Sequence, residues 1–218
     1  MTMRFKAVLF DLDGTLLDTL QDIATSGNTA LAAEGFPVHP VEAYKRFVGD
    51  GMEELVRRAL PEAHRDDATV SRALKSMKQA YREHWADTTR PYPGVPEMLT
   101  GLTERHIPMA ILSNKPEAST RLCAERLLAE WSFVLVRGAR PEVPRKPDPT
   151  AAKRIAEGLR LQPEEVLYLG DSGTDMRTAS TAGMFPAGAL WGFRTAEELL
   201  QSGARALLEQ PQDIIKLL

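Results

Sequence analysis

Residues 5–19, FKAVLFDLDGTLLDT, constrain the fold of this chain more than any other stretch. An apolar run at residues 7–10 leads directly to Asp11 and Asp13, and Gly14 follows. Apolar, β-prone residues that end at a glycine predict a buried strand followed by a tight turn. Because side chains two residues apart on a strand point the same way, the two carboxylates are expected to project together. The stretch therefore predicts a strand with an acidic pair at its tip.

This acidic pair has two interpretations. Neighbouring carboxylates repel each other unless a proton or a cation lies between them. Mg²⁺ takes oxygen ligands and keeps waters that a substrate can replace, so Asp11 and Asp13 are a candidate magnesium site. The alternative is a polar strand end with an ordinary turn, because Asp and Gly are common in turns.

Composition excludes several classes of protein. The chain has 218 residues, enough for one large domain or for one domain with an insertion. Its net charge of −3 gives no electrostatic footprint for nucleic acid, and Cys123 is its only cysteine, so an internal disulfide is excluded. No signal peptide and no apolar run long enough to span a membrane are recognisable, so a cytoplasmic location is expected.

Hydrophobic periodicity divides the chain into a helical block and an alternating part. Between residues 18 and 90 apolar residues recur at helical spacing, with no convincing strand, and helices are expected near 20–31, 40–47, 52–60 and 66–87. From residue 91 onward the pattern alternates. Strands are expected at 108–112, 133–136, 166–171 and 184–190, and helices at 94–105, 117–128, 150–158 and 173–183.

This order predicts an α/β fold with a mainly parallel sheet. Residues 1–16 and 91–218 are expected to form a Rossmann-like core domain. Residues 17–90 are expected to form an all-helical cap inserted after the first strand, with hinges at 16–19 and 88–93.

Polar residues follow four of the predicted strands. They are Asp11 with Asp13, Ser113 with Asn114, Lys146, and Asp171 with Asp175. Each has an ordinary alternative: Ser113 and Asn114 can cap a helix, Lys146 can be a solvated lysine, and Asp171 can order a turn. In parallel α/β sheets, however, ligands gather at the carboxyl ends of the strands. The joint occurrence of these residues at four strand ends therefore favours one site.

These four signals resemble the four motifs of phosphatases in the haloacid dehalogenase-like (HAD) superfamily. DLDGT matches motif I, Ser113 matches motif II, Lys146 in RKPDP matches motif III, and GDSGTD at 170–175 matches motif IV. The helical block resembles the type I cap of that family. Motif II carries Ser where Thr is frequent, which keeps the hydroxyl, and the loop before Lys146 lacks the frequent Gly-Gly-Asp sequence.

The resemblance implies a Mg²⁺-dependent phosphoric monoester hydrolase. Asp11 would attack phosphorus and form an aspartyl-phosphate, and Asp13 would be the general acid and then the general base. Lys146 and Ser113, with Asn114, would hold the phosphoryl group. Mg²⁺ would be bound by Asp11, the backbone of Asp13 and Asp171, with Asp175 supporting the metal waters or Lys146.

The substrate is constrained less than the reaction. The cap sequence VGDGMEELVRRAL and the C-terminal tail resemble the phosphoglycolate phosphatase branch, which implies 2-phosphoglycolate. Gly49, Asp50 and Gly51 could bind a substrate carboxylate at a helix start, or could simply form a turn with Asp50 as the helix cap. A small phosphorylated metabolite is the expected partner, with no nucleic acid or membrane, and the protein is expected to be a monomer or homodimer.

Several alternatives remain open at this point. One is a phosphomutase of the β-phosphoglucomutase type, and another is a phosphatase for pyrophosphate, sugar phosphates or nucleoside monophosphates. A phospho-acceptor module similar to receiver domains would lack both the insertion and the second aspartate of the pair. A dehalogenase would not need that second aspartate or Mg²⁺.

Overall fold

The computed structural model of the protein describes residues 5–218, which divide into two compact units. The core unit consists of the chain up to Leu17 together with Pro91–Leu218, and the helical unit is Asp18–Arg90. No helix among the described residues is long and apolar enough to cross a membrane.

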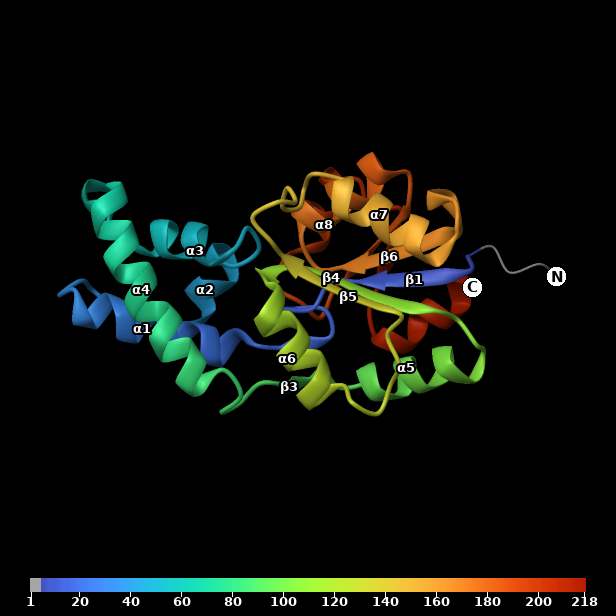
Figure 1. The fold of residues 1–218 in the computed structure, drawn as a ribbon, viewed down its shortest axis with the longest axis horizontal. Helices are drawn as coiled ribbons and strands as arrows, with labels where there is room; N and C mark the ends of the chain where they lie inside the picture. Colours follow the sequence, from blue (N-terminus) through green and yellow to red (C-terminus); the bar gives the residue numbers. More distant parts are fainter. Residues whose placement is uncertain (1–4) are drawn as a thin grey trace. The chain divides into compact units, whose positions relative to one another are not determined.

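A six-stranded parallel sheet forms the centre of the core unit, in the order β5-β4-β1-β6-β7-β8 (Figure 1). Its strands are β1 (Ala7–Phe10), β4 (Met109–Pro116), β5 (Leu135–Ala139), β6 (Val166–Gly170), β7 (Phe185–Ala189) and β8 (Ala206–Leu208). The chain builds outward from β1 in one direction and then returns to build from β6 in the other. This is the doubly wound order of Rossmann-like folds, which confirms the predicted fold class.

Helices cover both faces of this sheet. In Figure 1, α5 (Val95–Glu104) and α6 (Glu117–Leu127) lie on one face, and α7 (Thr150–Leu159) and α8 (Gly173–Ala182) lie on the other. Every residue of β1 and β6 is buried, as expected for parallel strands that are covered on both sides. Leu9, Tyr168, Ala156 and Ala179 belong to one hydrophobic cluster between the sheet and α7 and α8. The central strands of the sheet are therefore covered on both faces.

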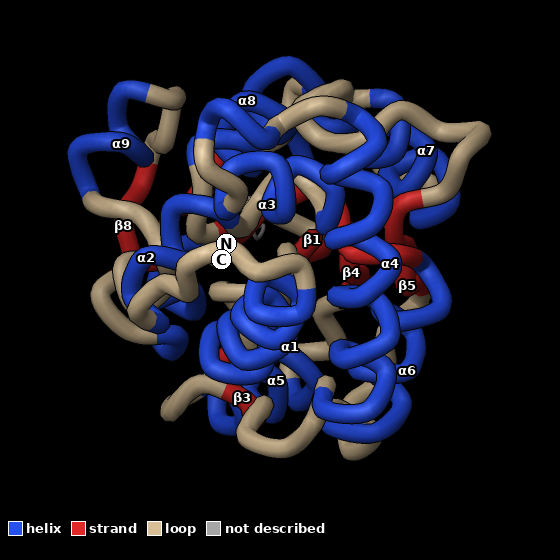
Figure 2. The backbone as a smooth tube through the Cα atoms, turned by 90° about the vertical axis from the view of Figure 1, so that its left-hand side faces the viewer, coloured by secondary structure: helices blue, strands red, loops and turns tan. Residues whose placement is uncertain are grey.

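The helical unit contains α1 (Leu20–Ala33), α2 (Val41–Phe47), α3 (Met52–Ala59) and α4 (Asp67–His84), with a 3₁₀ turn at Glu62–His64. The helices α1 and α4 lie side by side (Figures 1 and 2). Where α1 meets α2, a Cβ on Gly27 would lie 2.5 Å from the ring of Tyr44, so the glycine permits the close contact. The hydroxyl of Tyr44 donates to Asn28 at 2.9 Å, which satisfies a buried polar group.

Two local expectations differ from the structure. Two short strands, β2 (Leu17–Asp18) and β3 (Arg90–Pro91), lie where the chain passes from one unit to the other, and they pair with each other. Two-residue strands carry no periodicity, so the sequence could not reveal them. The strand β4 continues past the predicted end at residue 112, and its pairing with β5 shifts register between Leu112 and Pro116.

The C-terminal part contains structure that the sequence pattern did not predict. It forms α9 (Ala196–Gln201), the edge strand β8 and a 3₁₀ segment at Pro211–Leu217, and a further 3₁₀ turn precedes β6 at Pro163–Glu165. The strand β8 is only three residues long, and Ala206 and Leu207 are only partly buried. A short edge strand lacks the long apolar run on which the other strand predictions depended.

Asp22 is the most heavily hydrogen-bonded carboxylate of the helical unit. Its side chain is 2% exposed and accepts the backbone N–H groups of Thr88 and Thr89 at 2.8–3.1 Å and both of their hydroxyls at 2.6–2.7 Å. Burial alone would raise the pKa of Asp22, but these hydrogen bonds outweigh it and lower the pKa below its ordinary value. The first turn of α1 is thereby fastened to the segment that follows α4.

We expect Asp22→Asn to destabilise the folded protein by about 2–4 kcal/mol, because an amide nitrogen would face donors that now meet a carboxylate. Urea unfolding followed by circular dichroism measures this difference. Since the folded pKa of Asp22 lies below the unfolded value of about 3.9, its contribution is present above that pH. The difference between variant and wild type should therefore shrink as the pH falls through the folded pKa.

Asp67→Asn is the matched control, because the side chain of Asp67 is 96% exposed. It should change the stability by less than about 0.5 kcal/mol. Equal stability of Asp22→Asn and Asp67→Asn at neutral pH would contradict the role assigned to Asp22.

Candidate active site

The candidate site lies at the carboxyl ends of β1 and β6, where the strand order reverses. The two strands are neighbours in register, with Phe10 opposite Leu169, and Asp11 N donates to Leu169 O at 2.9 Å. Asp11 and Asp171 each follow the last residue of their strand, so the parallel pairing brings them to the same edge of the sheet. Ligands of doubly wound folds bind at this kind of reversal point.

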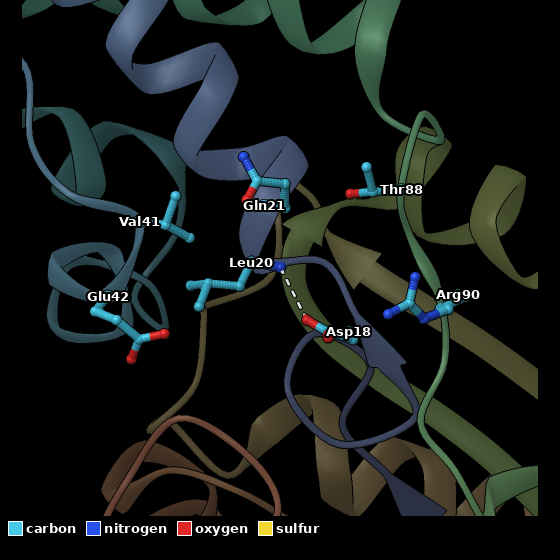
Figure 3. A pocket seen from close by; sticks show the side chains of 7 residues that line it. All are labelled: Asp18, Leu20, Gln21, Val41, Glu42, Thr88 and Arg90. Atoms are coloured by element: carbon cyan, nitrogen blue, oxygen red, sulfur yellow. Dashed lines mark hydrogen bonds between the residues drawn. The ribbon is translucent and has the colours of Figure 1, made fainter.

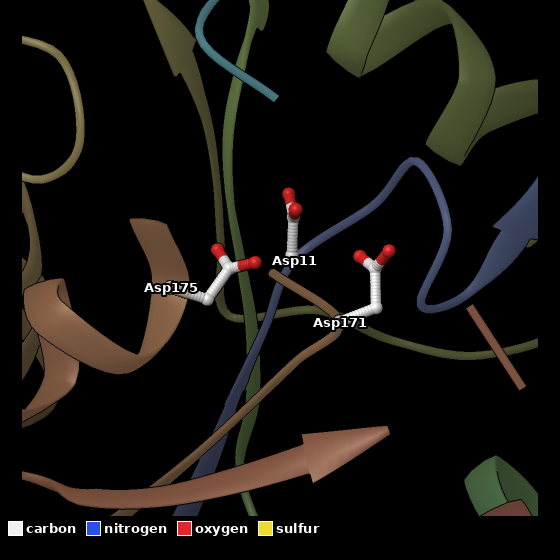
Figure 4. A group of neighbouring side chains, drawn as sticks. All are labelled: Asp11, Asp171 and Asp175. Atoms are coloured by element: carbon white, nitrogen blue, oxygen red, sulfur yellow. The ribbon is translucent and has the colours of Figure 1, made fainter. Parts of the chain in front are cut away.

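Three carboxylates meet there. Oxygens of Asp11, Asp171 and Asp175 lie within 4.8 Å of one another, and all three residues are buried (Figure 4). Asp175 is in the first turn of α8, where its carboxylate accepts Ser172 N at 3.1 Å and Ser172 Oγ at 2.6 Å. This reciprocal cap explains the GDSGTD sequence, because the capping residues that start α8 also fix an acidic side chain of the site.

Lys146 supplies the positive charge of this cluster. Its ammonium group lies 2.9 Å from Asp11 Oδ1 and 2.7 Å from Asp175 Oδ1, and it donates to Leu112 O at 3.1 Å. A lysine has three N–H donors, and these three contacts use them. The backbone of Lys146 is held in turn by Asn114, whose amide accepts Lys146 N at 2.9 Å and donates to Lys146 O at 3.0 Å.

Burial and an excess of negative charge together determine the pKa values of the cluster. Burial, together with repulsion from Asp175, raises the pKa of Asp11 well above its ordinary value, although Lys146 opposes the shift. Burial and Asp175 also raise the pKa of Asp171 to about 7. For Lys146, burial acts to lower the pKa, but the attraction of Asp11 and Asp175 outweighs it and raises the pKa above its ordinary value.

The residues present fit a divalent cation. The donors are hard carboxylate oxygens, which Mg²⁺ and Ca²⁺ prefer. Three buried carboxylates face one lysine, and the raised pKa values of Asp11 and Asp171 show that this site favours added positive charge. A cation at this point would relieve the repulsion that burial makes costly.

Asp171 is fixed by a loop that the sequence prediction missed. Its carboxylate accepts Thr15 Oγ1 at 3.1 Å and Phe193 N at 2.8 Å. Between Trp191 and Phe193 the loop passes so close that a Cβ on Gly192 would lie 2.2 Å from Asp171 Cβ. Trp191 Nε1 donates to Thr15 O at 2.9 Å, which ties the same loop to the turn after β1. No spacing in the sequence marks WGF as a neighbour of Asp171.

Asp13 occupies a different environment from Asp11. Its carboxylate lies 2.7 Å from the ammonium of Lys115, and the two side chains are 12% and 5% exposed. The predicted group of Asp11, Asp171 and Asp175 comes together, whereas the Asp13 side chain is paired with a residue to which sequence analysis gave no role. The sequence SNKP, which contains Lys115, was the only indication of this partner, but a lysine before a proline is also typical of an exposed turn.

Ser113 is buried within β4, two residues before Lys115. It is 4% exposed, and its hydroxyl accepts Lys115 N at 3.2 Å. Ser113 therefore contacts the backbone of Lys115, as Asn114 contacts the backbone of Lys146. Their predicted contact with a substrate phosphoryl group stays a prediction.

The predicted cap residues lie in the helical unit. Gly49 and Gly51 have φ values of +128° and +95°, a conformation that glycine adopts without strain. Gly51, not Asp50, is the N-cap of α3, and Asp50 instead pairs with Arg58. The expected alternative of Asp50 as a helix cap is therefore wrong, because an ion pair on α3 holds its carboxylate.

The helical unit also has a polar hollow of about 360 Å³ that does not include these cap residues (Figure 3). It is lined by Asp18, Leu20, Gln21, Val41, Glu42, Thr88 and Arg90. Within it, Leu20 N donates to Asp18 Oδ1 at 3.4 Å. Two carboxylates and one guanidinium give its lining no excess of positive charge, so it lacks the character of an anion site.

Comparison with known proteins identifies the family. The model of the haloacid dehalogenase-like hydrolase family matches residues 8–189. A phosphoglycolate phosphatase of Chromobacterium violaceum is 35% identical over 197 residues, covering 89% of each chain. One from Nitrosospira multiformis is 33% identical over 218 residues, covering 98% of this chain and 95% of the relative. This chain belongs to the haloacid dehalogenase-like hydrolase family, as its four motifs predicted.

Solved structures agree with this assignment. A protein from Lactobacillus delbrueckii subsp. bulgaricus has a TM-score of 0.93 and 29% identity, with 99% of each chain covered. A predicted phosphoglycolate phosphatase from Haemophilus somnus has a TM-score of 0.90 and 26% identity, with 100% of this chain and 99% of the other covered. The match extends over both units of the chain.

If the carboxylate cluster binds a divalent cation, Mg²⁺ should stabilise the protein. We expect millimolar Mg²⁺ to raise the melting temperature of the wild type by several degrees and EDTA to reverse this, since a ligand that binds only the folded state stabilises it. Because a carboxyl with a pKa of about 7 must lose its proton to bind the cation, the shift should diminish as the pH falls below 7.

Asp171→Asn should abolish this Mg²⁺-dependent shift, and Asp67→Asn should retain it. Thermal unfolding with and without Mg²⁺ makes the comparison. An undiminished shift in Asp171→Asn would show that the cation binds elsewhere.

Proposed function

We propose that the protein is a Mg²⁺-dependent phosphoric monoester hydrolase that acts through an aspartyl-phosphate, with 2-phosphoglycolate as its substrate. The observation that carries the proposal is the different environment of the two motif I aspartates. Asp11 lies in the carboxylate cluster against Lys146, and Asp13 lies outside it against Lys115. This difference supports the assignment of nucleophilic attack to Asp11 and of proton transfer to Asp13.

In the first step, Asp11 attacks phosphorus, an Asp11–phosphorus bond forms and the ester oxygen–phosphorus bond breaks. Asp13 gives its proton to the departing alkoxide oxygen, which leaves as an alcohol. The contacts from Leu12 N at 2.7 Å and from Lys146 fix the orientation of the Asp11 carboxylate before attack. Such fixed orientation is a main source of rate enhancement in phosphoryl transfer.

In the second step, water attacks the phosphorus of the aspartyl-phosphate and gives a proton to Asp13, which restores both carboxyl groups. Lys146 would turn one of its three N–H donors from a protein acceptor to a phosphoryl oxygen, and the hydroxyl of Ser113 would donate to another. Asp11, Asp171 and the backbone of Asp13 would hold Mg²⁺, which would supply charge neutralisation when bound. Asp175 fixes Lys146 and supports the cation from outside.

The substrate assignment is supported by the relatives. The proteins of Chromobacterium violaceum and Nitrosospira multiformis that this chain resembles along most of its length are phosphoglycolate phosphatases. A small phosphorylated acid would need an anion contact besides the phosphate site. The backbone of Gly49, Asp50 and Gly51 at the start of α3 is our candidate for that contact.

Asp11→Asn should reduce Mg²⁺-dependent hydrolysis of p-nitrophenyl phosphate and of 2-phosphoglycolate by on the order of 10³-fold or more, because the amide is a poor nucleophile. Asp13→Asn should slow turnover by on the order of 10²-fold while the Mg²⁺-dependent thermal shift persists. Phosphate release assays measure both. Full activity of Asp11→Asn would contradict the proposed mechanism.

A comparison of kcat/KM over phosphorylated metabolites tests the substrate. The panel should include 2-phosphoglycolate, pyrophosphate, glucose 1-phosphate and a nucleoside monophosphate. We expect the highest kcat/KM for 2-phosphoglycolate. A clear preference for any other member would contradict the assignment of 2-phosphoglycolate and leave the reaction class unchanged.

A further inference from the structure

Lys115 is a buried lysine that the mechanism above does not use. The residue is 7% exposed, and its ammonium group lies 2.7 Å from Asp13 Oδ1. A buried charge is costly unless it is paired, so this contact makes both side chains tolerable in the interior. Lys146 forms an ion pair with Asp11, and Lys115 forms an ion pair with Asp13. The site therefore has one lysine for each of its motif I carboxylates.

Two hydrogen bonds fix the backbone of Lys115, from which its side chain extends. Its N–H donates to Ser113 Oγ at 3.2 Å, and its carbonyl accepts Thr120 Oγ1 at 3.1 Å. These contacts lie where the pairing of β4 with β5 shifts register, between Leu112 and Pro116. The irregular end of β4 thus fixes the backbone from which the Lys115 side chain reaches Asp13.

We propose that Lys115 is the positioning residue of the acid–base group, fixing the Asp13 carboxylate through Oδ1 so that its Oδ2 exchanges the proton with the reacting oxygen. The proposal rests on the function assigned to Asp13 above. Without the ammonium group, the carboxylate could rotate, and the proton would less often lie in line with the leaving oxygen. Proton transfer in the transition state depends on this alignment.

This role predicts a dependence on the leaving group. In the first step a poor leaving group, such as the alkoxide of 2-phosphoglycolate, needs the proton of Asp13, whereas p-nitrophenolate leaves without it. In the second step the aspartyl-phosphate is the same for every substrate, and water must give its proton to Asp13. Loss of Lys115 should therefore slow the first step only for substrates with a poor leaving group. It should slow the second step for every substrate.

The experiment compares Lys115→Met with the wild type on both substrates. We expect kcat/KM for 2-phosphoglycolate to fall by about 10- to 100-fold and kcat/KM for p-nitrophenyl phosphate to change by less than about 3-fold. For p-nitrophenyl phosphate, kcat and KM should fall together, because breakdown of the aspartyl-phosphate becomes slower. Lys115→Arg, which keeps a positive charge, should recover part of the activity on 2-phosphoglycolate.

A double-mutant cycle distinguishes an effect through Asp13 from a general loss of structure. If Lys115 acts through Asp13, adding Lys115→Met to Asp13→Asn should lower kcat little further, whereas independent effects would multiply. Lys6→Met, which removes a surface ion pair to Glu165, is the matched control and should keep wild-type kinetics on both substrates.

Equal losses of kcat/KM on the two substrates, or multiplied losses in the cycle, would overturn the proposal. So would wild-type kinetics of Lys115→Met. If one of these contradicting results is found while Asp11→Asn abolishes activity in the same assays, only the role of Lys115 is overturned. If Asp11→Asn stays active, the proposed function itself fails.

Discussion

Repulsion among buried carboxylates is the constraint on which the candidate site depends. Asp11, Asp171 and Asp175 lie within 4.8 Å of one another, and the ammonium of Lys146 contacts two of them. Burial, together with the repulsion of three negative charges that face one positive charge, raises the pKa values of Asp11 and Asp171. The parallel pairing of β1 with β6 keeps Asp11 and Asp171 together in spite of this cost. A cation bound among the three carboxylates would relieve this repulsion.

The architecture was predictable because it depends on long, regular patterns. Buried parallel strands such as 166–170 are continuous apolar runs, and the helices of 18–90 show clear helical spacing. Asp11 and Asp171 directly follow the ends of neighbouring parallel strands, so the topology brings them together without further information. By contrast, β2, β3 and β8 are two or three residues long and have too few residues for a period to emerge.

The contacts that orient the site were not predictable in the same way. Lys115 reaches Asp13 because β4 continues beyond its apolar run, and Phe193 N reaches Asp171 because a glycine loop passes close to it. Both depend on tertiary approach between residues 102 and 22 positions apart. Composition and periodicity describe single segments, so the partners of Asp13 and Asp171 had to come from the structure.

The central claim is that Asp11 becomes covalently phosphorylated during turnover. Acid quenching within a single turnover, borohydride reduction and peptide mass spectrometry would detect an aspartyl-phosphate as homoserine at its position. The account predicts homoserine at position 11, formed only with substrate and Mg²⁺ and accumulating more in Asp13→Asn with p-nitrophenyl phosphate, because water attack is slowed. Complete turnover with Asp11 unmodified at every quench time, or modification of another residue, would contradict it.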